Sequence, residues 1–267
     1  MSVKVLRWAL AAAVVVSWIS AAIFGAYILA FYGGAIPANA MGAWNSSLPR
    51  LYEAHTVGAT ISIGLHFAGG GILLLLGPLQ LIEPLRRRWP AVHRWIGRLY
   101  ALAAALAGIG GLAFIVMKGT IGGMPMNVGF AGYGALVVLA AVQTYRYGRA
   151  RDLETHRAWA IRLYALAIGS WLYRMDYGLW AIVGHLAGHT RTFSGWFDAV
   201  MAFFFYVPNL GIAELVIRSR QRPLRSGLRI ATAIALVIAT LFIATATVYF
   251  TILGWGPGII AGWTSSY

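Results

Sequence analysis

Seven long apolar segments constrain the fold of this chain more than any other feature of its sequence. A helix needs about 20 mainly apolar residues to cross the hydrocarbon core of a bilayer. Segments of that kind lie at roughly 8–33, 56–82, 96–117, 128–147, 159–183, 196–217 and 229–254. Because lipid offers no partners to backbone N–H and C=O groups, an open sheet cannot cross it. The sequence therefore predicts an all-α, polytopic membrane bundle of about seven transmembrane helices, formed as a single domain over residues 1–267.

The composition agrees with this fold and removes several classes of chemistry. Of the 267 residues, 60% are hydrophobic and 10% are charged, whereas about 25% are charged in soluble domains. Cysteine is absent, which excludes disulfides, thiol nucleophiles and cysteine-ligated zinc or iron–sulfur centres. A metal or haem would have to rest on His, Met or carboxylate ligands. The nucleotide-binding and hydrolase motifs that could be recognised by spacing are also absent.

The basic residues predict the orientation of the bundle. Lys4 and Arg7 precede the first segment, and three alternate loops carry five arginines each. The three loops contain Arg86, Arg87, Arg88, Arg94 and Arg98; Arg146, Arg149, Arg151, Arg157 and Arg162; and Arg218, Arg220, Arg222, Arg225 and Arg229. The opposite loops hold only Arg50, Lys118 and Arg191. By the positive-inside rule the N-terminus is cytoplasmic and the C-terminus lies outside. The net charge of +14 then faces anionic lipid headgroups at the cytoplasmic face, and it does not indicate nucleic-acid binding.

The chain also contains an internal repeat around two of these loops. An offset of 63 residues aligns Gly69 with Gly132, Gly71 with Gly134, Gln80 with Gln143, Arg86 with Arg149, Arg88 with Arg151, His93 with His156 and Arg94 with Arg157. The second and third segments therefore form one hairpin, and the fourth and fifth form its copy. Copies of equal orientation are related by a pseudo-two-fold axis along the membrane normal. The repeat predicts that His93 and His156 approach one another near the cytoplasmic side.

Polar side chains inside the apolar segments are the leading candidates for a binding site, because burying them in lipid is costly unless they have partners. His66 lies about ten residues inside the second segment and is the strongest single ligand candidate. Arg174 lies at a comparable depth in the fifth segment and needs an anion. That anion is Asp198, Glu53, or a bound group such as a haem propionate, a quinone headgroup or a lipid phosphate. A hydrogen-bonded structural histidine and an Arg–Asp pair between helices are the alternatives.

Three further histidines form a candidate metal site on the outer side. His185 and His189 have the i, i+4 spacing that places two imidazoles on one face of a continuous helix. Such a pair suits a transition metal when a third ligand is present. His55 or His66 is the expected third ligand.

Several short motifs resemble one bacterial family. They are Gly77-Pro78-Leu79-Gln80, Arg86-Arg87-Arg88, His93-Arg94-Trp95-Ile96-Gly97-Arg98-Leu99-Tyr100 and His156-Arg157-Ala158-Trp159-Ala160-Ile161-Arg162-Leu163-Tyr164. Together with Arg174 they resemble the membrane-protein family called domain of unknown function 2306, over a core of roughly residues 55–180. The resemblance implies a multi-pass protein of the bacterial inner (cytoplasmic) membrane and supplies no reaction. The residues at matching positions are His66, Gln80, His93, Arg98, His156, Arg162 and Arg174.

Two functional hypotheses follow. In the first, the bundle binds haem b or a quinone and takes part in electron transfer. Its candidate cofactor-binding residues are His66, His93, His156, Arg98, Arg162 and Arg174. A looser likeness to membrane b-type cytochromes favours haem, although the fourth segment has no histidine. In the second, the protein is a non-enzymatic lipid-binding, transport or respiratory-complex accessory or assembly protein. A membrane-protein partner or a second copy of the chain fits either hypothesis.

Overall fold

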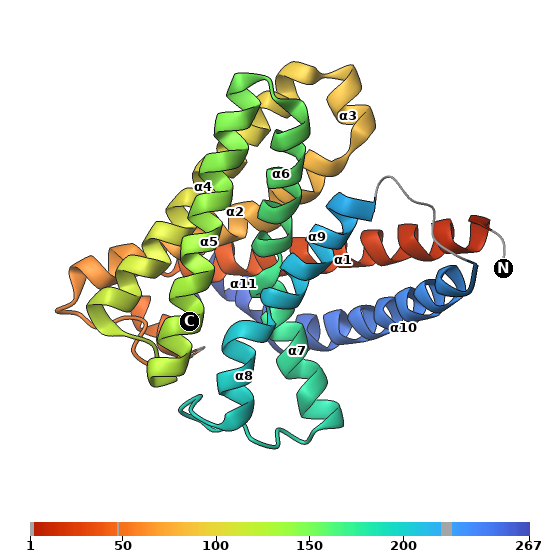
Figure 1. The fold of residues 1–267 in the computed structure, drawn as a ribbon. Coiled ribbons are helices and arrows are strands. Elements are labelled where there is room, and N and C mark those ends of the chain that lie inside the picture. Colours follow the sequence, from red (N-terminus) through yellow and green to blue (C-terminus); the bar gives the residue numbers. More distant parts are fainter. Residues whose placement is uncertain (1–2, 47, 220–225) are drawn as a thin grey trace.

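The computed structural model describes residues 3–46, 48–219 and 226–267, and these residues form helices and no strand (Figure 1). Arg220, Arg222 and Arg225, which were part of the orientation argument, lie outside the described residues. The α-helices are α1 Val3–Gly34, α2 Val57–Leu81, α3 Glu83–Arg88, α4 Pro90–Lys118, α5 Gly123–Ala150, α6 Leu153–Ala167, α7 Gly169–Val183, α8 Trp196–Phe204, α9 Val207–Ser219, α10 Ser226–Phe250 and α11 Gly256–Thr264. A 3₁₀ helix spans Met41–Ser46, and a π-helical turn, Thr251–Trp255, joins α10 to α11.

Six helical segments of the described chain are long and apolar enough to cross a membrane. They are Lys4–Gly34, Val57–Leu81, Pro90–Lys118, Gly123–Ala150, Trp196–Arg218 and Ile230–Thr264. An all-helical membrane bundle is thus confirmed. The expected fifth span, 159–183, is not among the six, because it falls on two helices of 15 residues each, α6 and α7.

The boundary between α6 and α7 is an interruption within one helical path. Ile168 separates the two helices, yet its N–H donates to the Tyr164 carbonyl at 3.2 Å and its carbonyl accepts from Leu172 N–H at 3.0 Å. Gly169 follows at a point where an added Cβ would lie 3.3 Å from the rings of Phe205 and Tyr133. The crowding by these rings explains why a residue without a side chain follows the interruption.

Pro208 interrupts the helix of the expected sixth span, 196–217. Proline lacks an N–H and its ring clashes with the carbonyl four residues earlier, so it bends or breaks a helix. Accordingly α8 ends at Phe204 and α9 begins at Val207. The Asn209 side chain donates to the Phe205 carbonyl at 2.6 Å and so satisfies a backbone group at the break.

The helices pack in two groups around two apolar clusters. One cluster centres on Phe24, Trp44 and Trp171, and the other on Ala104 and Leu163. α1 packs against α2, α10 and α11, while α2, α4, α5 and α6 form a sequential bundle. In Figure 1, α3 and the α5–α6 turn lie at one end of this bundle, and the α7–α8 connection lies at the opposite end.

Glycines bring α2 and α4 into close contact. A Cβ added at Gly110 would collide with the Ser62 carbonyl, and one added at Gly69 would lie 2.6 Å from the Ala103 carbonyl. Small residues at helix interfaces in membranes permit this kind of backbone approach. The α2–α4 pair therefore forms a fixed wall on which the side chains of both helices are held in place.

Candidate functional site

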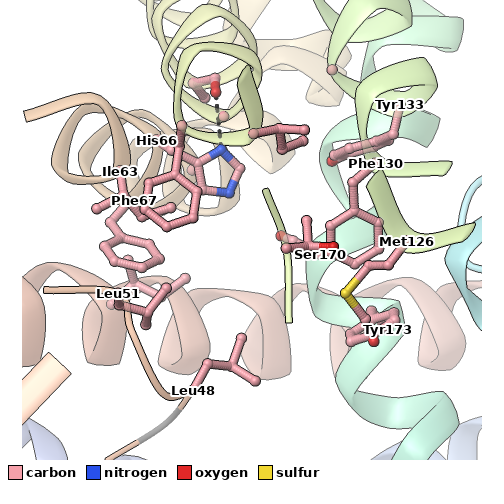
Figure 2. A pocket seen from close by; sticks show the side chains of 18 of the residues that line it. Leu48, Leu51, Ile63, His66, Phe67, Met126, Phe130, Tyr133, Ser170 and Tyr173 are labelled. Carbon is pink, nitrogen blue, oxygen red and sulfur yellow. Dashed lines mark hydrogen bonds between the residues drawn. The ribbon is translucent and has the colours of Figure 1, made fainter. Parts of the chain in front are cut away.

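A cavity of about 230 Å³ lies among α1, α2, α4, α5 and α7. Its walls are mainly aromatic and aliphatic, and they include Phe24, Phe67, Phe114, Phe130 and Tyr133. Figure 2 shows His66 on one side of the space and Ser170, Tyr133 and Tyr173 on the other. An apolar cavity with a few convergent polar groups is the usual form of a small-molecule site.

His66 is oriented by a backbone hydrogen bond. Its Nδ1 lies 2.9 Å from the Ala107 carbonyl oxygen. A carbonyl only accepts, so Nδ1 carries a proton and donates it. Gly111 provides room for the ring, because a Cβ there would lie 3.0 Å from Nδ1. The second ring nitrogen faces the cavity (Figure 2). In the neutral ring this Nε2 carries a lone pair, which can accept a hydrogen bond or ligate a metal.

Arg174 also lines the cavity, and its guanidinium carbon lies 5.3 Å from the centre of the Phe24 ring. It makes no ion pair with any carboxylate of the described residues. Glu53 pairs instead with Arg50 and Lys118. Both oxygens of Asp198 are engaged by other groups. Neither expected protein partner of Arg174 is therefore its partner in the structure.

A loop fastened by Lys118 borders the cavity. Leu48, Pro49, Arg50 and Leu51 contribute to its lining. The Lys118 ammonium donates to the Arg50 carbonyl at 2.8 Å and lies 3.1 Å from a Glu53 carboxylate oxygen. These hydrogen bonds, first from Lys118 and then from Arg50, hold the pKa of Glu53 below its ordinary value.

The other histidines of the predicted cofactor set lie at the arginine-rich end. His156 Nδ1 donates to the Thr144 carbonyl at 2.8 Å. His93 lies close enough to His156 for the two rings to interact electrostatically. In the described part of the chain the His93 Nδ1 atom is buried without a hydrogen-bond partner, as are polar atoms of Gln80, Tyr100 and Thr144. The structure thus places His93 and His156 away from the cavity lining.

The two arginines of the set occupy matching environments. Arg98 lies over the Trp95 ring at 4.9 Å, and Arg162 lies over the Trp159 ring at 4.8 Å. Arg162 also forms an ion pair with Glu214. Neither arginine lines the cavity.

The three histidines of the candidate metal site are not gathered into a site. α7 ends at Val183, and His185 has a left-handed backbone with φ of 46°. His185 and His189 therefore do not share a helix face, and the spacing argument was wrong for that reason. Within the residues that the structure describes, no group of three or more His, Asp or Glu residues could hold a metal, and His55 lies apart in the α1–α2 loop.

The sequence did not reveal what His189 contacts. Its Nδ1 donates to Asp198 at 2.7 Å, and Tyr177 donates to the same carboxylate oxygen at 2.7 Å. The available signal was the position of Asp198 in the first turn of α8, where acidic residues accept backbone hydrogen bonds. The Gly195 N–H does donate to Asp198 at 3.0 Å.

A family model described as "Predicted membrane protein (DUF2306)" matches residues 63–217 of the chain. The chain belongs to this family. The matched range contains most of α2 and the whole of the helices from α3 to α8. No curated protein and no solved structure matches this DUF2306 protein.

Proposed function

We propose that this DUF2306 protein binds a quinone headgroup in the cavity between His66 and Arg174. The observation that carries the proposal is that Arg174, which has no carboxylate partner among the described residues, lines the same aromatic cavity as the His66 imidazole. A guanidinium in an apolar site is stabilised by a polar or anionic ligand. Arg174 is suited to donate to a quinone carbonyl oxygen, and His66 Nε2 is suited to accept from the hydroxyl of the reduced form.

The aromatic walls support a flat ring as the ligand. Rings of Phe67, Phe114, Phe130 and Tyr133 contribute to the lining. Aromatic faces pack well against a planar conjugated ring. A quinone bound there supplies its own two-electron chemistry, and the protein contributes binding, orientation and charge.

Haem b fits this cavity less well than a quinone does. Of the histidines among the described residues, His66 is the one in the cavity lining, whereas His55, His185 and His189 lie elsewhere. A haem in the cavity would have one imidazole ligand and not the two of b-type cytochromes. We therefore propose a quinone, and not haem b, as the ligand of this cavity.

The proposal includes a topology with seven spans. α6 and α7 together form the additional span, because backbone hydrogen bonds continue through Ile168. The N-terminus is cytoplasmic, the C-terminus lies outside, and the membrane is the bacterial inner membrane. The matched stacking of Arg98 on Trp95 and of Arg162 on Trp159 supports the hairpin repeat.

Exposed arginines support lipid headgroups as additional partners. Arg86, Arg87 and Arg88 are exposed on α3, and Arg149 and Arg151 are exposed at the α5–α6 turn. Each basic residue near an anionic membrane surface contributes about 1 kcal/mol of attraction. We propose that these turns bind anionic headgroups of the cytoplasmic leaflet.

The proposed function is tested by titrating purified protein in nanodiscs with a short-chain ubiquinone. Arg174→Gln should weaken the Kd by about 10- to 100-fold, because it removes a hydrogen bond from a charged group. His66→Gln should weaken binding of the reduced form. Arg146→Gln, a change at an exposed arginine of the arginine-rich end, is the matched control and should bind as the wild type does.

Two results contradict the proposal. The first is an equal ubiquinone affinity of the wild type and Arg174→Gln. The second is a stoichiometric haem α-band in the dithionite-reduced minus oxidised spectrum of the purified protein, which would restore the haem hypothesis.

A further inference from the structure

A continuous chain of hydrogen bonds leads away from the cavity. Tyr173 lines the cavity (Figure 2), and its hydroxyl donates to the Tyr177 hydroxyl at 3.2 Å. Tyr177 donates to Asp198 Oδ1 at 2.7 Å. His189 Nδ1 donates to the same oxygen at 2.7 Å. Four titratable side chains are thus connected in sequence, and we call them the Tyr173–His189 chain.

The Tyr173–His189 chain runs from a buried centre to a partly exposed end. Asp198 is fully buried, whereas 19% of the His189 side chain is exposed. His189 precedes α8 in the α7–α8 connection, at the end of the bundle opposite α3 and the α5–α6 turn (Figure 1). The Tyr173–His189 chain therefore connects the cavity to the surface at the end of the bundle that lacks the arginine-rich turns.

Backbone groups hold the central carboxylate in position. Asp198 Oδ2 accepts from Thr190 N–H at 3.1 Å and from Gly195 N–H at 3.0 Å. Four donors in total stabilise the anion, so the carboxylate keeps a fixed orientation toward Tyr177 and His189. A fixed acceptor that is shared by a tyrosine and a histidine is the arrangement that proton transfer needs.

Aromatic rings surround the chain. Phe193 lies 5.7 Å from Tyr177 and 4.9 Å from His189, and Phe197 lies 5.1 Å from Tyr177. Phe205 lies 5.4 Å from Tyr173. These rings border the hydroxyl groups, and the hydroxyl groups form a continuous hydrogen-bonded route for a proton.

We propose that the Tyr173–His189 chain carries protons between the cavity ligand and water at this end of the bundle. The inference rests on the proposed function, because it takes a ligand with an ionisable hydroxyl, as in a quinol or a hydroxyquinone. A role in structure alone would require the Asp198 hydrogen bonds but would not require their extension through Tyr177 and Tyr173 to the cavity wall.

The transfer balances as follows. The ligand hydroxyl gives its proton to the Tyr173 oxygen, Tyr173 gives its own proton to Tyr177, and Tyr177 gives its own to Asp198. Asp198 gains this proton as an anion; the His189 ring then turns over, its Nε2 takes the carboxyl proton, and its Nδ1 proton passes to water. The ligand has then lost one proton, water has gained one, and no electron has moved. The Tyr173–His189 chain is then reset, because Asp198 is again an anion that accepts from a protonated nitrogen of His189.

The test uses 2-hydroxy-1,4-naphthoquinone, whose colour changes when its hydroxyl ionises. The protein is held in nanodiscs with the probe bound, the pH is changed in a stopped-flow instrument, and the rate of the colour change is recorded. Tyr177→Phe should slow this rate by about 100-fold, the size of effect expected from a positioned proton-transfer group. The Kd for the probe should stay within about twofold of the wild-type value, since Tyr177 does not line the cavity.

Two more variants make the result decisive. Tyr173→Phe interrupts the first link and leaves the bonds of Tyr177 and His189 to Asp198 in place, so it should slow the exchange as well. Tyr206→Phe removes the hydroxyl of a buried tyrosine that lies outside both the chain and the cavity lining, and it should exchange at the wild-type rate.

The outcomes separate the two proposals. If the probe binds and both Tyr177→Phe and Tyr173→Phe exchange at the wild-type rate, the proton chain is wrong and the binding site stands. If the probe does not bind, the quinone site is wrong and the proton chain loses its ligand. Slowed exchange in both variants with unchanged exchange in Tyr206→Phe supports the chain.

Discussion

Replacing Arg174 by methionine should stabilise the ligand-free protein while it weakens ligand binding. Arg174 is half-buried at the cavity and has no carboxylate of the described residues as an ion-pair partner. A desolvated cation of this kind lowers stability, and replacement of a buried ion pair by apolar side chains, the nearest comparison, commonly gains about 1–4 kcal/mol. Methionine adapts its shape to irregular cavities and is therefore a suitable replacement.

The expected gain lies near the lower end of that range. Arg174 lies over the Phe24 ring at 5.3 Å, and this cation–π contact, worth about 0.5–1 kcal/mol, is lost in the variant. Partial exposure of the side chain also reduces the desolvation cost. A net gain of about 1 kcal/mol corresponds to a rise in Tm of about 2–4 °C for a chain of this size.

The assay is thermal unfolding in nanodiscs without ligand and with saturating ubiquinone. Arg174→Met should unfold at a higher temperature than the wild type without ligand, and added ubiquinone should raise its Tm less than it raises the wild-type Tm. Arg146→Met at the exposed arginine-rich end controls for the loss of one positive charge. A lower ligand-free Tm in Arg174→Met would refute the reasoning, because it would mean that Arg174 stabilises the fold itself.

Two further predictions concern the cavity border and the α2–α4 wall. Lys118 and Arg50 lower the pKa of Glu53. The ionised Glu53 carboxylate therefore stabilises the fold above the ordinary glutamate pKa, and this stabilisation is lost as the pH falls through the lowered pKa. The Tm difference between wild type and Glu53→Gln should accordingly vanish in acid. Gly110→Val places a side chain against the Ser62 backbone and should cost about 1–3 kcal/mol by overpacking. Gly211→Ala, where a Cβ meets nothing within 4 Å, is its control in the same unfolding assay, and equal Tm values for the two variants would contradict the close packing.

The sequence predicts a helix well where the apolar run is long and uninterrupted. The expected second span, 56–82, corresponds to α2 Val57–Leu81. The interruption at Ile168 was not predicted, and the rings of Phe205 and Tyr133 that pack beside Gly169 come from other parts of the sequence. Those rings belong to α5 and to the α8–α9 junction, so no local pattern around residue 168 reveals them.

The candidate site was predictable only in part for the same reason. The cost of burying a polar group in lipid singled out His66 and Arg174 from the sequence, and both line the cavity. The link from His189 to Asp198 depends on the end of α7 at Val183 and on the path of the following loop. A helical-spacing argument assigned His189 to a metal because it assumed that the helix continued.

The composition of the cavity walls determines how its occupancy should be expressed. A ligand that suits walls of phenylalanine and tyrosine dissolves in the bilayer far more readily than in water. The relevant dose is then the mole fraction of the ligand among the lipids and not its molar concentration in the buffer. At a fixed total amount of ligand, added lipid dilutes it and lowers occupancy, so affinities measured in nanodiscs of different lipid content agree only on the mole-fraction scale.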